Sequence, residues 1–264
     1  MKGIEINTSF EYEDRIVAFI DILGFRSFVN ETVDKESNVN LVKLKKLGES
    51  LILIKEEFKK ANENILYPAG VTITYFSDSI VISILPTSVV TETLLEVLET
   101  LKRVQIKLIN NGILLRGGIV QGKIIHNSEM ILGPAMISAY DLESKSALYP
   151  RITIDPKIIY ELFDERGNSL EDHDFRKVFM IDFDNTFYVD YFTDIKHYIA
   201  DQKEYYQNLR TLIRNGVKRA DIGIRMKYLW MLNKFNNSKP HNIQKMKYNG
   251  DDEIKEELKF DSPL

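Results

Sequence analysis

Short β-branched apolar runs alternate with longer amphipathic stretches along the first half of the chain. Residues 15–20, RIVAFI, form one such apolar run, which predicts a buried strand. Between about 37 and 62, leucine, isoleucine and phenylalanine recur at spacings of three and four, which predicts a helix with one buried face. The same spacing over about 88–109 predicts a second long helix. A short helix is expected directly after Gly24.

Two further stretches complete the pattern of this half. The sequence VTITYFSDSIVISI, residues 71–84, predicts two strands joined by a tight turn at Ser77-Asp78-Ser79. Residues 113–125, ILLRGGIVQGKII, predict a fourth strand, whose glycines permit close approach of a backbone or a ligand. The expected order is therefore strand, helix, helix, strand, strand, helix, strand. This order predicts an α+β fold of the ferredoxin-like βααββαβ type, with helices covering the sheet.

The second half is expected to add a helix over 133–149, a strand over 151–155 and a hairpin over 177–192 that turns at Asp184-Asn185. Residues 194–248 differ in composition, because they carry 12 Lys or Arg against 4 Asp or Glu. Their helical period around Trp230 predicts packing helices. We therefore expect one domain over 1–193 and a helical C-terminal appendage over 194–264 that packs on the same domain.

Charge and composition exclude several classes of protein. A net charge of -4 and a pI near 5.7 give no general attraction to nucleic acid or to anionic membranes, so we expect neither as a partner. The chain has no cysteine, which excludes disulfides and thiolate metal sites. No apolar run approaches the roughly 20 residues that span a bilayer, and the N-terminal residues lack the apolar segment of a signal peptide. We expect a soluble, cytoplasmic protein.

The basic residues of 194–248 admit two interpretations. A pair of basic helices can bind nucleic acid, but a run of charges more often forms a solvated face. The solvated face is the favoured interpretation, and a nucleic-acid-binding module is the alternative.

Two carboxylates interrupt the apolar strands. Asp21 follows the first strand, and Asp78 lies in the turn of the hairpin. Each alone has an ordinary explanation, because Asp caps helices and is common in turns. In the predicted fold, however, the hairpin lies beside the first strand, so the two side chains face each other. Paired carboxylates repel unless a cation lies between them, and hard divalent ions such as Mg²⁺ accept one or two carboxylates together with phosphate oxygens.

Three segments, in order, resemble the class III nucleotide cyclases, the catalytic domain of adenylate and guanylate cyclases. The segment FIDILGF, 19–25, resembles the first metal-binding motif of that family. The segment FSDSIVIS, 76–83, resembles the hairpin with the second metal-binding aspartate. LLRGGIVQGKI, 114–124, and LGPAMISAYDLES, 132–144, resemble the family's arginine-glycine strand and the helix that crosses its active site. The resemblance covers roughly 15–155.

The resemblance implies the chemistry of the site. The domain over 1–193 is then a cyclase palm, in which Asp21 and Asp78 hold two Mg²⁺ or Mn²⁺ ions and Ile22 contributes its carbonyl. The triphosphate is expected to lie against the backbone of Leu23, Gly24 and Phe25. The implied reaction converts a nucleoside triphosphate to a 3′,5′-cyclic nucleotide and pyrophosphate. The implied assembly is a homodimer with active sites at the interface.

Four positions depart from the family pattern. The residues that read the base fall on Thr74 and Met130, which match neither the adenylate nor the guanylate pattern. The transition-state Asn and Arg of the crossing helix fall on Ile137 and Asp141, so both groups are missing. Developing charge on the phosphate still needs cations. The candidates to supply them are Arg116, Lys145 and Arg151, with Lys123 as a further one.

Metal-binding aspartates with rewritten base-reading positions resemble the bacterial antiphage pyrimidine cyclases of the Pycsar type. We therefore expect conversion of UTP, or next CTP, to a cyclic second messenger in antiphage defence. The alternatives are a purine cyclase, a catalytically silent nucleotide-binding sensor of the same fold, and a palm enzyme of the polymerase or diguanylate cyclase type. The segment VFMIDFDNTF resembles the opening of the haloacid-dehalogenase phosphatases, but too little chain follows Asp182 to complete that fold.

Overall fold

The computed structural model describes residues 10–63, 70–87, 90–166, 177–238, 246–248 and 254–256. Its strands are β1 (Glu13–Leu23), β2 (Val71–Phe76), β3 (Ser79–Ile84), β4 (Leu114–His126), β5 (Ile131–Leu132), β6 (Ile152–Ile154), β7 (Phe179–Ile181), β8 (Phe187–Val189), β9 (Met246–Tyr248) and β10 (Ile254–Glu256). Its helices are α1 (Phe25–Asn30), α2 (Leu41–Glu63), α3 (Val90–Asn110), α4 (Pro134–Ser146), α5 (Pro156–Arg166), α6 (Gln202–Val217) and α7 (Ile222–Ser238), with a short 3₁₀ helix at Ile195–His197.

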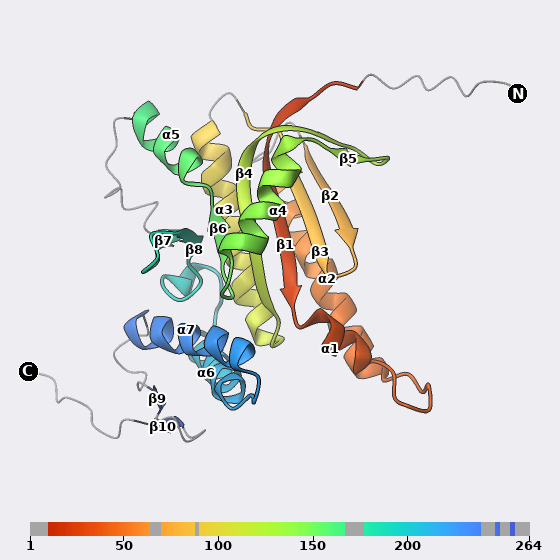
Figure 1. Ribbon diagram of the computed structural model, residues 1–264, viewed down its shortest axis with the longest axis vertical. Helices are drawn as coiled ribbons and strands as arrows, with labels where there is room; N and C mark the ends of the chain where they lie inside the picture. Colours follow the sequence, from red (N-terminus) through yellow and green to blue (C-terminus); the bar gives the residue numbers. More distant parts are fainter. Residues whose placement is uncertain are drawn as a thin grey trace, which may run out of the picture.

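A sheet of 8 strands forms the centre of the molecule, in the order β2-β3-β1-β4-β6-β8-β7, with β5 paired to β4. The neighbours β2, β3, β1 and β4 are antiparallel, whereas β4 and β6 are parallel. Figure 1 shows α4 in front of this sheet and α2 and α3 behind it. The expected α+β class, with a sheet flanked by helices, is confirmed.

Alternation along β1 decides which side chains face which layer. The even-numbered positions of 16–22 lie in the main core, which α2 and α3 complete. Val17 and Phe19 point to the other face and pack with Ala139 of α4. Asp21 continues this second series, so it lies on the face of the sheet that α4 covers.

The observed order β1-α1-α2-β2-β3-α3-β4 matches the predicted βααββαβ order. The two predicted hairpin turns also form, with positive φ of 59° at both Ser77 and Asn185. β1 runs further than its apolar sequence indicates, as far as Leu23. The reason is pairing with β4, in which Asp21 lies opposite Arg116.

Helices α6 and α7 pack on the edge of the core that α3 and β8 provide. Ile106 of α3, Tyr188 of β8 and Trp230 of α7 belong to one apolar cluster. The two helices approach closely at Gly216, where a Cβ would lie 2.0 Å from Cγ of Tyr228. Figure 1 shows both helices at the end of the sheet toward which β1 runs. Within the described ranges, every helix is too short or too polar to span a membrane.

Candidate active site

Three elements bring charged side chains together at one end of the sheet. Nε of Arg116, on β4, lies 2.8 Å from Oδ2 of Asp21, on β1, and 2.6 Å from Oε1 of Glu143, on α4. Glu143 is buried at 3% exposure, because its position on α4 follows Ala139 by four residues and faces the sheet. The guanidinium of Arg116 therefore lies between two carboxylates.

The second predicted metal ligand, Asp78, lies beside this group. Its strand β3 pairs with β1, and the backbone N–H of Ile22 donates a 3.0 Å hydrogen bond to the carbonyl of Asp78. This bond ties the β2–β3 turn to the last residues of β1. The side chain of Asp78 is exposed, whereas Asp21 is half-buried and the Ile22 side chain is in the core. The predicted neighbourhood of the hairpin and the first strand is confirmed.

The charges at this end of the sheet influence one another. Burial raises the pKa of Asp21 above its ordinary value, Arg116 opposes the rise, and the charge of Asp78 adds to it. Burial likewise raises the pKa of Glu143, with Arg116 and Lys227 opposing and the two aspartates adding. Three carboxylates thus face two cationic side chains, and a further cation is favoured there.

The donor set fits a hard divalent ion that is shared with a substrate. Mg²⁺ is usually bound by one or two carboxylates together with phosphate oxygens and water. Within the described residues, no group of three or more His, Asp or Glu side chains forms a complete metal cage. Oδ2 of Asp21 accepts a hydrogen bond from Arg116, and among the described residues no hydrogen bond to its Oδ1 is found. That oxygen and the exposed carboxylate of Asp78 are therefore the atoms suited to such an ion.

Sequence reasoning missed two members of this group, Glu143 and Lys227. Glu143 could have been found from the four-residue spacing of Ala135, Ala139 and Glu143 along the inner face of α4. Lys227 belongs to α7, and its charge acts on both Asp21 and Glu143. No local sequence pattern predicts that Lys227 lies near these carboxylates, because its position depends on how α7 packs.

The predicted base-reading residue Thr74 lies in a second polar group on the same face of the sheet. Oγ1 of Thr74 is 2.9 Å from Nε2 of His126, and Nδ1 of His126 is 2.8 Å from Oγ of Ser83. Arg15 donates a 3.1 Å hydrogen bond to the same Ser83 hydroxyl. Burial, followed by the charge of Arg15, lowers the pKa of His126 to about 4. The imidazole is therefore neutral at neutral pH.

A cavity of about 400 Å³ lies beside Thr74 at the edge of the sheet. Its lining is mostly polar or basic and comes from α2, β2 and the turn after β4: Lys55, Lys59, Val71, Thr72, Ile73, Thr74, Asn127 and Ser128. Met130, the other predicted base-reading residue, lies in that turn, where its N–H donates a 2.9 Å hydrogen bond to Oδ1 of Asn127. Thr74 and Met130 are thus near the same cavity, and their role in reading a base stays a prediction.

The predicted phosphate cradle forms the turn between β1 and α1. Gly24 adopts a left-handed conformation with φ of 78°, and its carbonyl accepts hydrogen bonds from the N–H groups of Ser27 and Phe28. Leu23 and Phe25 are half-buried on either side of it. A contact of these residues with a triphosphate stays a prediction.

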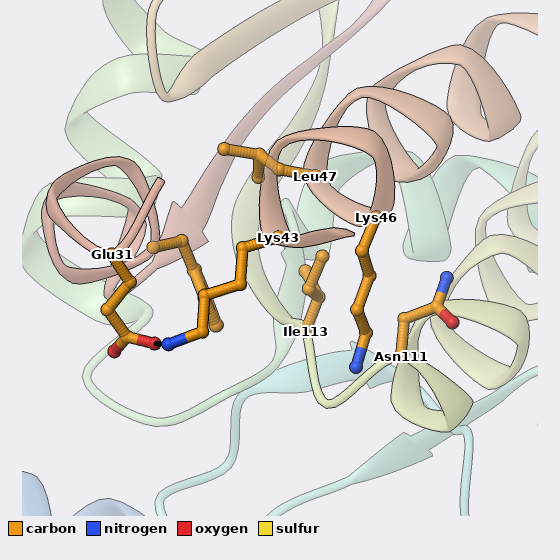
Figure 2. A pocket seen from close by; sticks show the side chains of 7 residues that line it. Glu31, Lys43, Lys46, Leu47, Asn111 and Ile113 are labelled. Carbon is orange, nitrogen blue, oxygen red and sulfur yellow. Dashed lines mark hydrogen bonds and ion pairs between the residues drawn. The ribbon is translucent and has the colours of Figure 1, made fainter. Parts of the chain in front are cut away.

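A smaller cavity of about 140 Å³ lies between α1, α2 and the turn that joins α3 to β4. Figure 2 shows the ion pair of Glu31 with Lys43 at its rim, with N–O separation of 2.8 Å, and Lys46 near Asn111. None of the predicted site residues lines it. Its size suits water or a small group rather than a nucleotide.

The other predicted cations lie elsewhere. Lys145 is on the exposed side of α4, where Nζ is 2.8 Å from Oδ2 of Asp141. Lys123 is likewise exposed, with Nζ 3.7 Å from Oδ2 of Asp14. Neither is paired with the Asp21 group, and their catalytic role stays a prediction.

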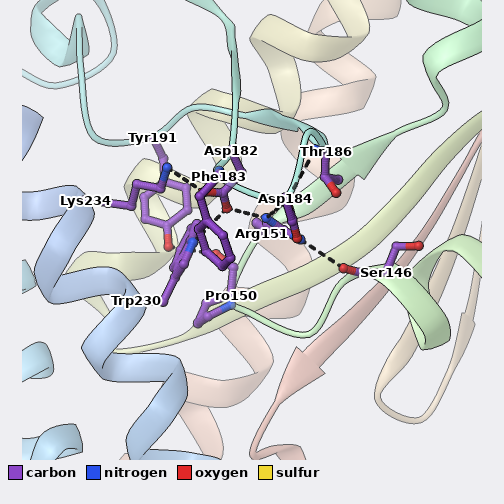
Figure 3. Close-up of polar contacts among 10 residues, drawn as sticks. All are labelled: Ser146, Pro150, Arg151, Asp182, Phe183, Asp184, Thr186, Tyr191, Trp230 and Lys234. Carbon is purple, nitrogen blue, oxygen red and sulfur yellow. Dashed lines mark hydrogen bonds and ion pairs between the residues drawn. The ribbon is translucent and has the colours of Figure 1, made fainter.

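Arg151 is fully buried in a separate ionic cluster (Figure 3). It contacts Asp182 and donates a 3.1 Å hydrogen bond to Oδ1 of Asp184. Asp182 also accepts a 2.7 Å hydrogen bond from Nε1 of Trp230 and lies 2.7 Å from Nζ of Lys234. These contacts support a structural role for Arg151 rather than contact with phosphate. Both oxygens of Asp182 have partners in this cluster, which does not suit the free carboxylate that a phosphatase nucleophile requires.

Comparison with known proteins gives structural neighbours but no sequence match: no family model and no curated protein matches the chain. The structure is similar to the adenylyl cyclase CyaB from P. aeruginosa, with a TM-score of 0.44 and 17% identity over 59% of this chain and 83% of that one. It is also similar to the guanylate cyclase domain of RhGC from Catenaria anguillulae in complex with GTP, with a TM-score of 0.43 and 16% identity over 69% and 98% of the two chains. A class III adenylyl cyclase-like ATP-binding protein from Pseudomonas aeruginosa matches with a TM-score of 0.43 and 12% identity, over 88% of this chain and 45% of that one.

Proposed function

We propose that the protein is a nucleotidyl cyclase, which converts a nucleoside triphosphate to its 3′,5′-cyclic monophosphate and pyrophosphate. The observation that carries this proposal is the meeting of Asp21 and Asp78 at adjacent strand ends, with Arg116 beside them. Phosphoryl transfer needs little covalent help from a protein. It depends on positioning and on neutralising charge, which carboxylate-bound metal ions and cationic side chains provide.

Asp21, Asp78 and the carbonyl of Ile22 would hold the Mg²⁺ or Mn²⁺ ions, of which we propose two. Such ions lower the pKa of an attacking hydroxyl and neutralise phosphate oxygens. Arg116 contacts both of its carboxylates through Nε. In the described part of the chain, no hydrogen bond is formed by its two terminal nitrogens, which leaves those donors to orient a phosphate group.

We further propose a pyrimidine substrate, UTP first and CTP next, with a purine triphosphate as the alternative. Support comes from Thr74 and Met130, which replace the residues that read purines, and from the neutral His126 that shares a hydrogen bond with Thr74. A site whose polar groups pair with one base rejects a base that leaves them unpaired. A homodimer with active sites at its interface, and a cyclic product that signals in antiphage defence, complete the proposal and rest on the sequence resemblance.

One observation favours a second candidate, a silent nucleotide-binding sensor of the same fold. Arg116 already pairs with Oδ2 of Asp21, one of the oxygens that a metal ion would need. If that pair persists when a nucleotide binds, the protein would bind the nucleotide without turning it over.

Incubation with each of the four nucleoside triphosphates and Mn²⁺, followed by chromatography, tests the proposal. Cyclic UMP or cyclic CMP is the expected product, and Asp78→Ala should lower its formation by at least about 100-fold. A cyclic purine product would replace the pyrimidine assignment by the alternative. Nucleotide binding without any cyclic product would favour the sensor, and neither binding nor product would overturn the proposed function.

A further inference from the structure

We infer that Lys227, on α7, completes the candidate active site as a cation that binds the phosphates of the substrate. This inference rests on the proposed function and adds a residue that lies outside the segments resembling the cyclases. It also gives α7 a role in substrate binding, in addition to its packing against one end of the core.

The position of α7 is fixed by Trp230. Its ring stacks on Tyr149, with ring centres 5.5 Å apart and planes 7° apart, and meets Tyr188 edge-on at 5.8 Å. Nε1 of Trp230 donates a hydrogen bond of 2.7 Å to Asp182. Trp230 is only 6% exposed, so an aromatic anchor holds this helix against β8 and the loop before β6.

Helical spacing places Lys227 on the anchored side of α7. Lys227, Trp230 and Lys234 lie at positions i, i+3 and i+7, which share one face of a helix. Lys234 is held at one end of this face by Asp182, at 2.7 Å. Lys227 lies one turn beyond Trp230 toward the start of the helix. Leu23, the last residue of β1, packs against the apolar cluster to which α7 contributes.

Figure 1 shows α7 at the end of the sheet toward which β1 runs, which is the end that carries the candidate site. The charge of Lys227 also influences the pKa values of Asp21 and Glu143. Lys227 is half-buried. Within the described residues its ammonium group forms no hydrogen bond and no ion pair, although the charges of three carboxylates, Asp21, Asp221 and Glu143, act on it.

The Lys227 ammonium, which has no hydrogen-bond partner among the described residues, is suited to bind a phosphate group. Burial and then Arg116 lower the pKa of the Lys227 ammonium, and Asp21, Asp221 and Glu143 oppose this lowering. A triphosphate brings several negative charges and acceptor oxygens to the same place. A lysine provides a compact charge with three donors that reaches such oxygens from a flexible stem. Lys227 therefore fits the cationic role better than Lys145 or Arg151, which have carboxylate partners of their own.

The full-length chain with Lys227→Met tests the inference, with Lys203→Met on the exposed side of α6 as the matched control. Two readouts are needed: kcat and KM with the accepted triphosphate, and binding of pyrophosphate in the presence of Mg²⁺ by calorimetry. Loss of one charge-assisted contact predicts pyrophosphate binding weaker by about 10-fold or more, and a similar or larger loss of kcat/KM. Lys227→Arg should recover part of both losses, whereas Lys203→Met should change neither.

The outcomes separate this inference from the proposed function. If the wild type turns over a triphosphate, and Lys227→Met has the same kcat, KM and pyrophosphate affinity, the inference is overturned and the proposed function stands. Pyrophosphate binding that Lys227→Met weakens, in a wild-type protein without turnover, supports the inference and overturns the cyclase reaction. A thermal melt checks folding. If Lys227→Met is unfolded, Lys227→Gln and Lys227→Arg take its place, and equal pyrophosphate binding by these two variants and wild type contradicts a phosphate contact.

Discussion

Arg116 is the residue that makes the charge arrangement at the candidate site compatible with a folded protein. Asp21 and Glu143 come from different elements, and their side chains are 15% and 3% exposed. Without the guanidinium between them, two poorly hydrated carboxylates would face each other. The same residue is suited to act on phosphate, so structural and chemical roles are joined in one side chain.

Replacing Arg116 by methionine should therefore destabilise the protein by about 2 kcal/mol near neutral pH. The loss should shrink as the pH falls. The two carboxylates have raised pKa values in the fold, so the folded state takes up protons before the unfolded state does and the repulsion disappears. Urea unfolding at pH 7.5 and pH 5 measures the difference, and a variant whose deficit grows toward pH 5 would contradict this account.

His126, at the other end of the same face of the sheet, should make the stability of the protein depend on pH in the opposite sense. Its pKa is lowered from 6.5 to about 4, first by burial and then by Arg15. Below about pH 6.5 the unfolded chain therefore binds a proton at His126, whereas the folded chain binds it only as the pH approaches about 4. The stabilisation is complete above pH 6.5 and declines as the pH falls toward 4, by about 3 kcal/mol in all. His126→Gln should flatten this slope in urea unfolding, whereas His197→Gln, at an exposed position, should not.

Part of this residue-level arrangement follows from the sequence alone. Asp21 and Asp78 are predictable neighbours, because the turn at Ser77 fixes the register of β2 and β3, and β3 pairs with β1. The pairing of Asp21 with Arg116 is not predictable in this way, because 95 positions separate them and the register of β1 on β4 decides it. The proximity of Lys227 depends on tertiary packing alone.

At the scale of elements, the close contact of α4 with β4 holds Glu143 at Arg116. A Cβ on Gly118 would lie 2.6 Å from the carbonyl oxygen of Ala139 and 2.9 Å from Cβ of Leu142. Only glycine allows the helix to lie so near the strand. One turn of α4 then brings Glu143 from this contact to the charged end of the sheet.

Gly118→Ala should displace α4, destabilise the protein by about 1–3 kcal/mol and lower turnover together with it. Gly48→Ala is the matched control, because a Cβ there meets nothing within 4 Å and alanine favours helix over glycine. That control should raise stability by up to about 1 kcal/mol and leave turnover unchanged. A Gly118→Ala protein with unaltered turnover would show that the position of α4 does not matter to the site.

The elements that sequence patterns predicted are those with long periodic runs or strong turn residues, such as α2, α3 and the two hairpins. Helix α5 was missed, although Pro156 at its first position is a helix-start signal. Strand β5 was missed because its two residues form a strand only by pairing with the end of β4. Short elements of this kind are made by neighbours rather than by their own sequence.

For the whole molecule, Asp182 is the point at which separate parts of the chain are joined. Arg151 directly precedes β6, Asp182 lies between β7 and β8, and Lys234 and Trp230 lie on α7. The cluster is almost entirely buried, and removing one member leaves an opposite charge without its partner, which is strongly destabilising. Its integrity is therefore required for α7, and with it Lys227, to stay at the candidate site.

Asp182→Asn should therefore destabilise the protein by about 3–5 kcal/mol, and Asp184→Asn, at a partly exposed position, by less.

Trp230 is the only tryptophan of the chain, so its fluorescence reports the docking of α7. If residues 194–264 pack on the same domain as 1–193, the fluorescence and far-UV circular dichroism of the wild type should change together in denaturant. In Asp182→Asn, Trp230 should become exposed at a lower denaturant concentration than that at which the sheet unfolds. Coincident transitions at the wild-type midpoint in this variant would mean that the Asp182 cluster does not hold α7 in place.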